Sequence, residues 1–168
     1  KQIQVARLKV EQSLAQVEFV NWLFEIFKEF VKTPPKSKKH NIYFNTLSTN
    51  IFYEFHKMFY QNHKKVIPEN IEQFLTPISF AVWFMGDGSV KSKECNGRIL
   101  NTHGFTEIEI TRLCQILNQK FDLITSIRRQ KDGLQIYISA KSAGVLTKLI
   151  SPHLLPYFIY KLPKGSLR

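Results

Sequence analysis

The sequence predicts an α+β protein in which helices alternate with antiparallel hairpins. From residue 76 onwards, three helical patterns and two hairpin patterns follow in the order αββαββα. The segment before residue 76 reads strand, helix, strand, helix, which looks like the same unit without its first helix and part of its first hairpin. We therefore expect a truncated first half over residues 1–75, a second half over 76–163 and a basic tail over 164–168.

The first half is read from alternation and helical spacing of apolar residues. Ser13 and Gln16 have the spacing of a capping box at the start of a helix. A proline-broken basic loop over residues 33–41 could touch phosphates or could simply be solvated. The other expected elements are strands over 5–12 and 42–47, helices over 14–31 and 49–60, and a polar loop over 61–68.

The second half carries stronger start and turn signals. Thr76 with Pro77 predicts a helix start, and Thr106 with Glu109 predicts a capping box. The expected elements are a short helix over 70–75, a helix over 77–87, a hairpin over 89–103 turning at Asn96-Gly97, a helix from 107, a hairpin over 124–140 turning at Asp132-Gly133, and a helix over 142–150. Joined hairpins with helices on one face leave the other sheet face open.

Asp87 ends the apolar helix that follows Pro77, with Gly88 expected as a left-handed C-cap. A carboxylate is disfavoured at this end because the helix dipole is negative there, by about 0.3–1 kcal/mol. An acid held against that field suggests a nearby cation, most simply a divalent metal. The alternative is a solvated turn residue, because Asp-Gly is a common turn pair.

The charge of the chain indicates an anionic partner. The 24 basic and 13 acidic residues give a formal net charge of +11, which favours nucleic acid first and an anionic membrane surface second. A basic but unspecialised protein is the alternative. The bases are spread along the chain, which suits a phosphate-contacting surface better than an amphipathic membrane helix, and no apolar run is long enough to span a membrane. We therefore expect no membrane partner.

An open, basic sheet face is suited to a nucleic-acid groove. Arg128 and Gln130 share one strand face, and Gln135 and Tyr137 share another. The expected contact residues are Lys91, Lys93, Arg98, Arg128, Arg129, Gln130, Gln135 and Tyr137.

Two features bear on the compartment. Cys95 and Cys114 read as free thiols in a reducing intracellular compartment, because they form no zinc-type cluster and no secretory signal is visible. Abundant Lys, Ile, Phe, Asn and Tyr, whose codons are AT-rich, suggest an organellar genome. We expect an organelle, a mitochondrion in preference to a chloroplast.

Residues 80–88, FAVWFMGDG, resemble the nine-residue motif of the LAGLIDADG homing endonucleases. They are most similar to the second motif of the single-chain members encoded in organellar introns. The likeness extends over almost the whole chain, through KKVIPENIEQFLTPISFAVWFMGDGS (64–89), GRILNTHGFTEIEITRLCQILNQKF (97–121), ISPHLLPYFIYKLP (150–163) and ARLKVEQS (6–13). The resemblance implies a saddle of two αββαββα halves whose sheets lie along the DNA major groove.

The resemblance also implies a catalytic site. The last acid of the motif, Asp87 by position, would bind the catalytic metal, Mg²⁺, at a scissile phosphate of duplex DNA. Lys65 in KKVIP and Lys161 in YKLP fall on the positions of the family's flanking lysines. Each could offset developing negative charge or polarise a water.

The sequence departs from the family pattern where the first motif is expected. The other aspartates, Asp122 and Asp132, lie in loop or turn contexts, and Gly86 stands where close relatives often carry a second acid. Three explanations stay open. The first motif could lie on a second polypeptide or an upstream segment, two copies could pair through the Asp87 helix, or catalysis could be lost. The last would leave a scaffold for DNA or structured RNA, in a maturase-like or ribosome-associated role.

Overall fold

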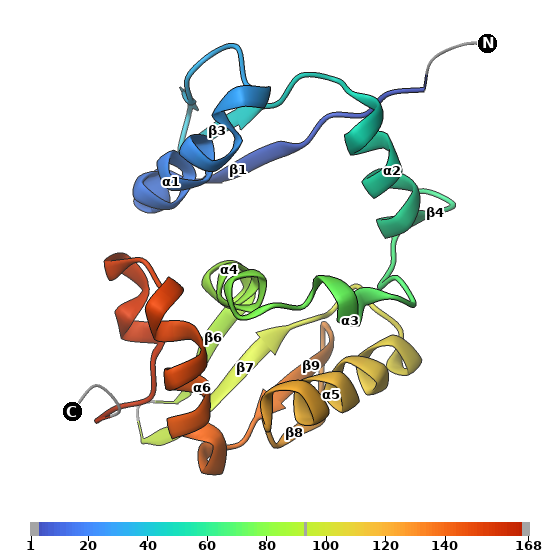
Figure 1. Cartoon of the computed structure of the whole chain (residues 1–168). Coiled ribbons are helices and arrows are strands. Elements are labelled where there is room, and N and C mark those ends of the chain that lie inside the picture. Colours follow the sequence, from blue (N-terminus) through green and yellow to red (C-terminus); the bar gives the residue numbers. More distant parts are fainter. Residues whose placement is uncertain (1–3, 93, 166–168) are drawn as a thin grey trace. The chain divides into compact units, whose positions relative to one another are not determined.

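A four-stranded antiparallel sheet organises the larger of the two units into which the chain divides, Lys1–Lys64 and Lys65–Arg168. The computed structural model describes residues 4–92 and 94–165 (Figure 1). Lys93, one of the expected contact residues, lies outside the described residues, as does the end of the expected basic tail.

The second unit follows the predicted order αββαββα. Its elements are α4 (Pro77–Asp87), β6 (Gly88–Ser92), β7 (Cys95–Asn101), α5 (Glu107–Phe121), β8 (Thr125–Gln130), β9 (Gly133–Ile138) and α6 (Ala143–Ile150), preceded by the short α3 (Ile71–Phe74). The strand order is β6-β7-β9-β8, so the two hairpins join through β7 and β9. Short 3₁₀ segments flank α6, and the last of them is η5 (Pro156–Lys161).

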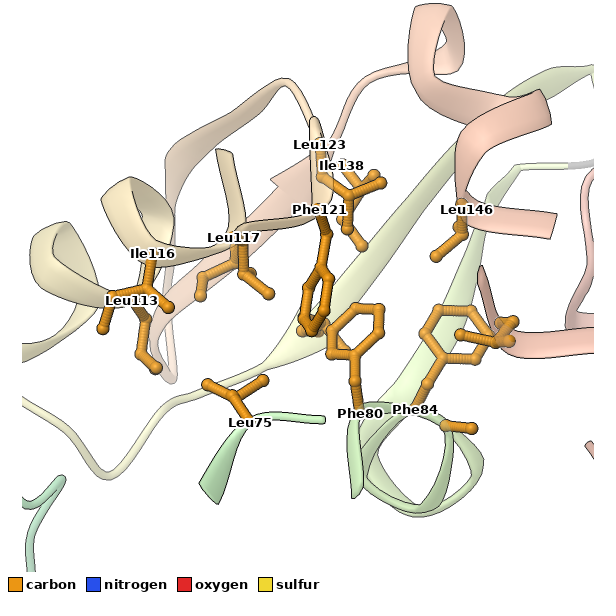
Figure 2. Close-up of a cluster of buried hydrophobic side chains, with 14 of the residues drawn as sticks. Leu75, Phe80, Phe84, Leu113, Ile116, Leu117, Phe121, Leu123, Ile138 and Leu146 are labelled. Carbon is orange, nitrogen blue, oxygen red and sulfur yellow. The ribbon is translucent and has the colours of Figure 1, made fainter. Parts of the chain in front are cut away.

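Helices α4, α5 and α6 share one core on one face of this sheet. Figure 2 shows Phe80 and Phe84 of α4 beside Phe121 of α5 and Leu146 of α6. The ring centroids of Phe80 and Phe121 lie 5.6 Å apart. From the sheet, Leu100, Ile136 and Ile138 complete this cluster, and all three are buried. The core therefore fixes α4 against the sheet and, with it, the helix end that carries Asp87.

Side-chain caps fix where the helices of the second unit begin. The Thr76 hydroxyl accepts a hydrogen bond from the Ser79 amide, and Thr106 does the same for Glu109. In each case the cap residue's own amide donates a hydrogen bond to the side-chain oxygen of the second residue, which completes a capping box. Both predicted helix starts are confirmed.

The first unit repeats part of the same topology. It contains β1 (Lys9–Ser13), α1 (Val17–Phe27), β2 (Lys36–Lys38), β3 (Asn41–Asn45) and α2 (Asn50–Phe59), with 3₁₀ turns on either side of α1. Its strand order, β1-β3-β2, matches the β7-β9-β8 part of the second sheet. Its core is small and consists of Val20 of α1 with Ile42 and Phe44 of β3.

Three local expectations in the first unit and at the motif helix are wrong. Ser13 makes no side-chain cap, and the buried Oε1 of Gln16 has no hydrogen-bond partner. Part of the basic loop, Lys36–Lys38, forms strand β2, which the prolines and lysines of this segment did not indicate. Gly88 is extended (φ −73°, ψ 143°) because α4 runs directly into β6; a Cβ there would collide with Phe84.

The first hairpin of the second unit also turns earlier than expected. Ser92 pairs with Cys95, so Asn96 and Gly97 lie within β7 instead of in the turn. The ring of Tyr137 occupies the space that a Cβ at Gly97 would need. This glycine therefore serves a close approach between strands and not a turn.

The boundary between the units lies at Lys64/Lys65, earlier than the expected division at 75/76. The short strands β4 (Tyr60–Gln61) and β5 (Lys64–Lys65) pair there across a turn in which Asn62 and His63 are left-handed. Beyond β5, the peptide groups of Ile67 hydrogen-bond to α5 side chains, which attaches this stretch to the second unit.

Candidate metal and nucleic-acid site

Asp87 is exposed at the C-terminal end of α4, as the sequence predicted. Partial desolvation raises the pKa of its carboxyl, while the positive charges of Lys65 and Lys161 and a hydrogen bond from Trp83 oppose that rise. The backbone carbonyl of Asp87 accepts a hydrogen bond of 2.9 Å from the Asn101 amide. Among the residues that the structure describes, the carboxylate forms no ion pair, but two ammonium groups lie near enough to influence it.

Lys161 is almost fully buried beside the end of α4. Its side chain is 6% exposed, and its Nζ donates a 2.6 Å hydrogen bond to the Met85 carbonyl. The ammonium also lies 5.0 Å from the centre of the Phe158 ring. Burial lowers the pKa of Lys161, and the charge of Asp87 opposes this. The carbonyl and the ring hold this ammonium in one position.

Lys65 is exposed on β5, and a clamp two residues later holds its chain. The Ile67 amide donates to Glu109 Oε1 at 2.8 Å, and the Ile67 carbonyl accepts from Arg112 at 2.6 Å. Both clamping residues belong to α5. The helix therefore fixes the segment that brings the Lys65 charge towards Asp87.

The donor set fits a metal that is shared with a substrate. Within residues 4–92 and 94–165, no group of three or more His, Cys, Asp or Glu side chains could hold a metal ion. Mg²⁺ is commonly bound through one or two carboxylates, with substrate phosphates and waters completing its octahedron. Asp87 offers one such carboxylate, beside a helix end whose carbonyls are partly negative.

Four predicted contact residues share the open face of the second sheet. Arg128 pairs with Gln135, and Tyr137 stands two residues further along β9 on the same face. Gln130 lies two residues after Arg128 on β8. Strand register thus brings together the two residue pairs that the sequence placed on separate strands.

Asn101 is a member of this face that the sequence reading missed. Its Oδ1 accepts a 2.8 Å hydrogen bond from Gln135, while its amide nitrogen binds the Asp87 carbonyl. A polar chain therefore runs from the sheet face to the end of α4. The signal was the alternation from buried Leu100, which puts Asn101 on the opposite face of β7.

Lys91 also reaches this face. Its ammonium lies 4.6 Å from the centre of the Tyr137 ring, whose hydroxyl is 3.8 Å from Cys95 Sγ. The Gly97 amide donates to the same sulfur at 3.3 Å. This backbone hydrogen bond, followed by that of Tyr137, lowers the pKa of Cys95.

Two expected contact residues lie elsewhere. Arg129 is on the helix side of β8 and forms a 2.6 Å ion pair with Glu107 at the start of α5. Arg98 is 2% exposed, and its guanidinium donates to carbonyls inside the second unit. Alternation along β8 puts Arg129 on the face opposite to that of Arg128. Arg98 occupies a core position that a sequence pattern assigns to an apolar residue.

The first sheet also presents an exposed basic edge. Lys36 and Lys38 of β2 are exposed, and register pairs them with Tyr43 and Asn41 of β3. On β1, Lys9 forms an ion pair with Glu11, which reduces its free charge. No helix in the described residues is long and apolar enough to cross a membrane.

Comparison with known proteins gives a matching family and several similar proteins. The model of the LAGLIDADG DNA endonuclease family matches residues 1–146. Cytochrome b mRNA maturase bI2 of Debaryomyces hansenii is 36% identical over 123 residues, covering 72% of this chain and 46% of the relative. Probable intron-encoded endonuclease 1 of Wickerhamomyces canadensis is 30% identical, covering 86% of this chain and 68% of the relative. The chain thus spans about half of the first relative's length.

Solved structures agree on the fold. The homing endonuclease I-WcaI, bound to its DNA recognition sequence, superimposes with a TM-score of 0.85 at 28% identity, covering 93% of this chain and 74% of that one. I-DmoI in complex with DNA and Mn superimposes with a TM-score of 0.58 at 15% identity, covering 87% of this chain and 81% of that one. The α+β fold with antiparallel sheets that the sequence resemblance implied is confirmed.

Proposed function

This chain belongs to the LAGLIDADG DNA endonuclease family, and on that basis we propose that it forms the second catalytic half of a site-specific, Mg²⁺-dependent duplex DNA endonuclease. The observation that supports this most directly is the exposed Asp87 carboxylate at the end of α4, under the influence of Lys65 and Lys161. The DNA-bound I-WcaI structure and the intron-encoded relative favour duplex DNA as the partner.

Asp87 would hold the metal, together with phosphate oxygens and waters. The bound cation would activate the attacking water and stabilise the leaving oxygen. Lys161, fixed by the Met85 carbonyl, keeps positive charge at one place beside this site and favours negative charge that develops on the phosphate. Lys65 adds a second, more exposed charge that can orient the phosphate or a water.

The open face would position the duplex. Arg128, Gln130, Gln135 and Tyr137 present donors and an aromatic ring for base edges and phosphates. Lys91 adds a charge suited to a phosphate. The basic edge of the first sheet would extend the contact along the DNA.

A second catalytic acid must come from outside these residues if both strands are cut. Asp122 is a left-handed helix cap and Asp132 is a hairpin-turn residue, so neither repeats the setting of Asp87. We propose that a segment or second polypeptide carrying the first motif supplies it. The cytochrome b mRNA maturase and the intron-encoded endonuclease among its relatives favour an organellar, mitochondrial location.

A structured-RNA scaffold is the second candidate. The maturase name of the 36% identical relative favours it, as does the single motif acid. In this reading the basic faces bind RNA backbone, and Asp87 has no catalytic role.

The two candidates are separated by Asp87→Asn. Two kinds of probe are used. The first is a duplex DNA library that includes the I-WcaI recognition sequence, and the second is a set of structured intron RNAs. We expect Mg²⁺-dependent cutting of DNA by the full chain with its first-motif partner, and a loss of about 10³-fold or more in Asp87→Asn, because a metal ligand is removed. Asp132→Asn is the matched control and should cut normally.

The pH dependence gives an independent check. Because the pKa of Asp87 is raised, protons compete with the metal at a higher pH than for an ordinary aspartate, so cutting should weaken early on acidification.

Cutting by Asp87→Asn at the normal rate would refute the metal role. RNA binding without any DNA cutting would favour the scaffold.

A further inference from the structure

Arg98 is a buried cation whose position the proposed function does not yet use. It is 2% exposed, and among the described residues no carboxylate lies within ion-pair distance of it. Burying an unpaired guanidinium is costly unless strong acceptors surround it. Such a residue in a core position therefore needs a specific reason.

Backbone carbonyls from two segments surround its guanidinium. Nε donates to the Lys161 carbonyl at 2.5 Å, and one terminal nitrogen donates to the Leu162 carbonyl. The other terminal nitrogen donates to Gly97 at 2.8 Å and to Cys95 at 3.2 Å. The planar fork thus joins the end of η5 to its own strand, β7.

This connection leads to the site in one further step. Arg98 fixes the backbone of Lys161, and the Lys161 ammonium fixes itself to the Met85 carbonyl at 2.6 Å, two residues before Asp87. Without the Arg98 hydrogen bonds, two carbonyls at the end of η5 lose their donors. The Lys161 side chain itself is held by the Met85 carbonyl and the Phe158 ring.

We propose that Arg98 is a positioning residue, which holds Lys161 beside Asp87 by binding the backbone of the segment that carries it. This inference rests on the proposed role of Lys161 at the phosphate. It replaces the expectation that Arg98 contacts nucleic acid. Lysine would not substitute fully, because a single ammonium cannot reproduce the fork.

The first arm of the test measures the position of Lys161 without any activity. A bulky amine-acylating reagent is applied to the full chain at fixed pH, and labelling of each lysine is followed by mass spectrometry. We expect Lys161 to be strongly protected in the natural protein, and its labelling to rise about tenfold or more in Arg98→Met as the ammonium leaves its buried site. Lys120, whose Nζ binds the Glu72 carbonyl at 2.7 Å, is the internal control and should not change.

The second arm uses single-turnover cutting of the DNA library at saturating protein. Arg98→Met should slow cutting about tenfold or more with DNA affinity changed less than twofold. In a Lys161→Met background, the same substitution should cause no further loss. Arg98→Lys should slow cutting by an intermediate amount. If Arg98→Met does not fold, the Arg98→Lys variant tests the positioning role instead.

Each arm of the test has an outcome that would contradict the positioning role. Unchanged protection of Lys161 in a folded Arg98 variant would overturn the positioning role, and so would fully additive losses in the double variant. If the natural protein together with its first-motif partner cuts no DNA, the proposed function fails, while the labelling arm still decides whether Arg98 positions Lys161.

Discussion

The two units share a topology but differ in what covers their sheets. In both, a helix and a hairpin follow one strand, β1 or β7, which gives the strand orders β1-β3-β2 and β7-β9-β8. The second unit adds β6 and α4, whereas the described residues of the first unit, 4–64, contain no counterpart of either. Both sheets present basic residues, and the second also has α4, which delivers the Asp87 carboxylate to the end of the sheet.

The presence of α4 also makes the hydrophobic core of the second unit larger than that of the first. Phe80 and Phe84 of α4 enlarge the core of the second unit, where α5 and α6 also meet. In the first unit, Phe44 packs edge-on against Phe24 at 5.9 Å in a small cluster with half-buried neighbours. We expect the second unit to be the more stable body.

The largest expected effects are losses of core volume. Phe80→Ala should destabilise the second unit towards the upper end of about 3–5 kcal/mol, because α4 cannot collapse into the gap. Phe44→Ala should lower the free energy of unfolding of the first unit by an amount towards the lower end of that range, because its small cluster can relax.

Each unit contains one tryptophan, Trp22 in the first and Trp83 in the second, so unfolding can be followed separately. Urea titrations of these variants in Trp22→Phe and Trp83→Phe backgrounds would report each transition. If both probes moved together for either variant, the two units would be one cooperative body and the comparison would fail.

Helix caps give a smaller and cleaner contrast. Thr106→Ala removes the observed capping box of α5 and should cost about 1 kcal/mol. Ser13→Ala removes a residue with the same sequence signature but no side-chain cap, and should cost close to nothing. The measurement is the urea midpoint of each unit, and a clear loss in Ser13→Ala would show that its cap forms in solution.

Charge on the two sheet faces should act on binding alone. Arg128→Ala on the second sheet and Lys38→Ala on the first should each reduce the slope of log affinity against log salt by about 1. Titration of the duplex library at several salt concentrations measures this. A changed slope for Arg128→Ala only would confine nucleic-acid contact to the second unit.

The smallest effect concerns pH. Burial alone would raise the pKa of Glu109, but hydrogen bonds from Ile67 and Thr106 outweigh it, so the pKa is lowered. Its stabilising contribution is therefore present above the unfolded pKa and is lost as pH falls through the folded pKa. Glu109→Gln should flatten the acid side of the Trp83 stability profile by less than the Thr106→Ala effect, and leave the Trp22 profile unchanged.

Much of this architecture was readable from the sequence because local signals agreed with the packing. Thr76, Thr106 and the apolar stripes placed the helices of the second unit, and the motif placed Asp87. Two of the failures are non-local. The partner of Gly97 is a ring on another strand, and two of the acceptors of Arg98 lie more than sixty residues away. No pattern along the chain encodes such contacts.

The Ile67 clamp has a consequence for how the boundary between the units opens. Because α5 holds both peptide groups of Ile67, fraying of the β4–β5 hairpin should stop there and not spread towards α4. The Ile67 amide should therefore exchange its hydrogen as slowly as the interior of α5, while the amides of Asn62 and His63 exchange quickly. Ile67 is therefore the point at which local unfolding of the chain between the units should end.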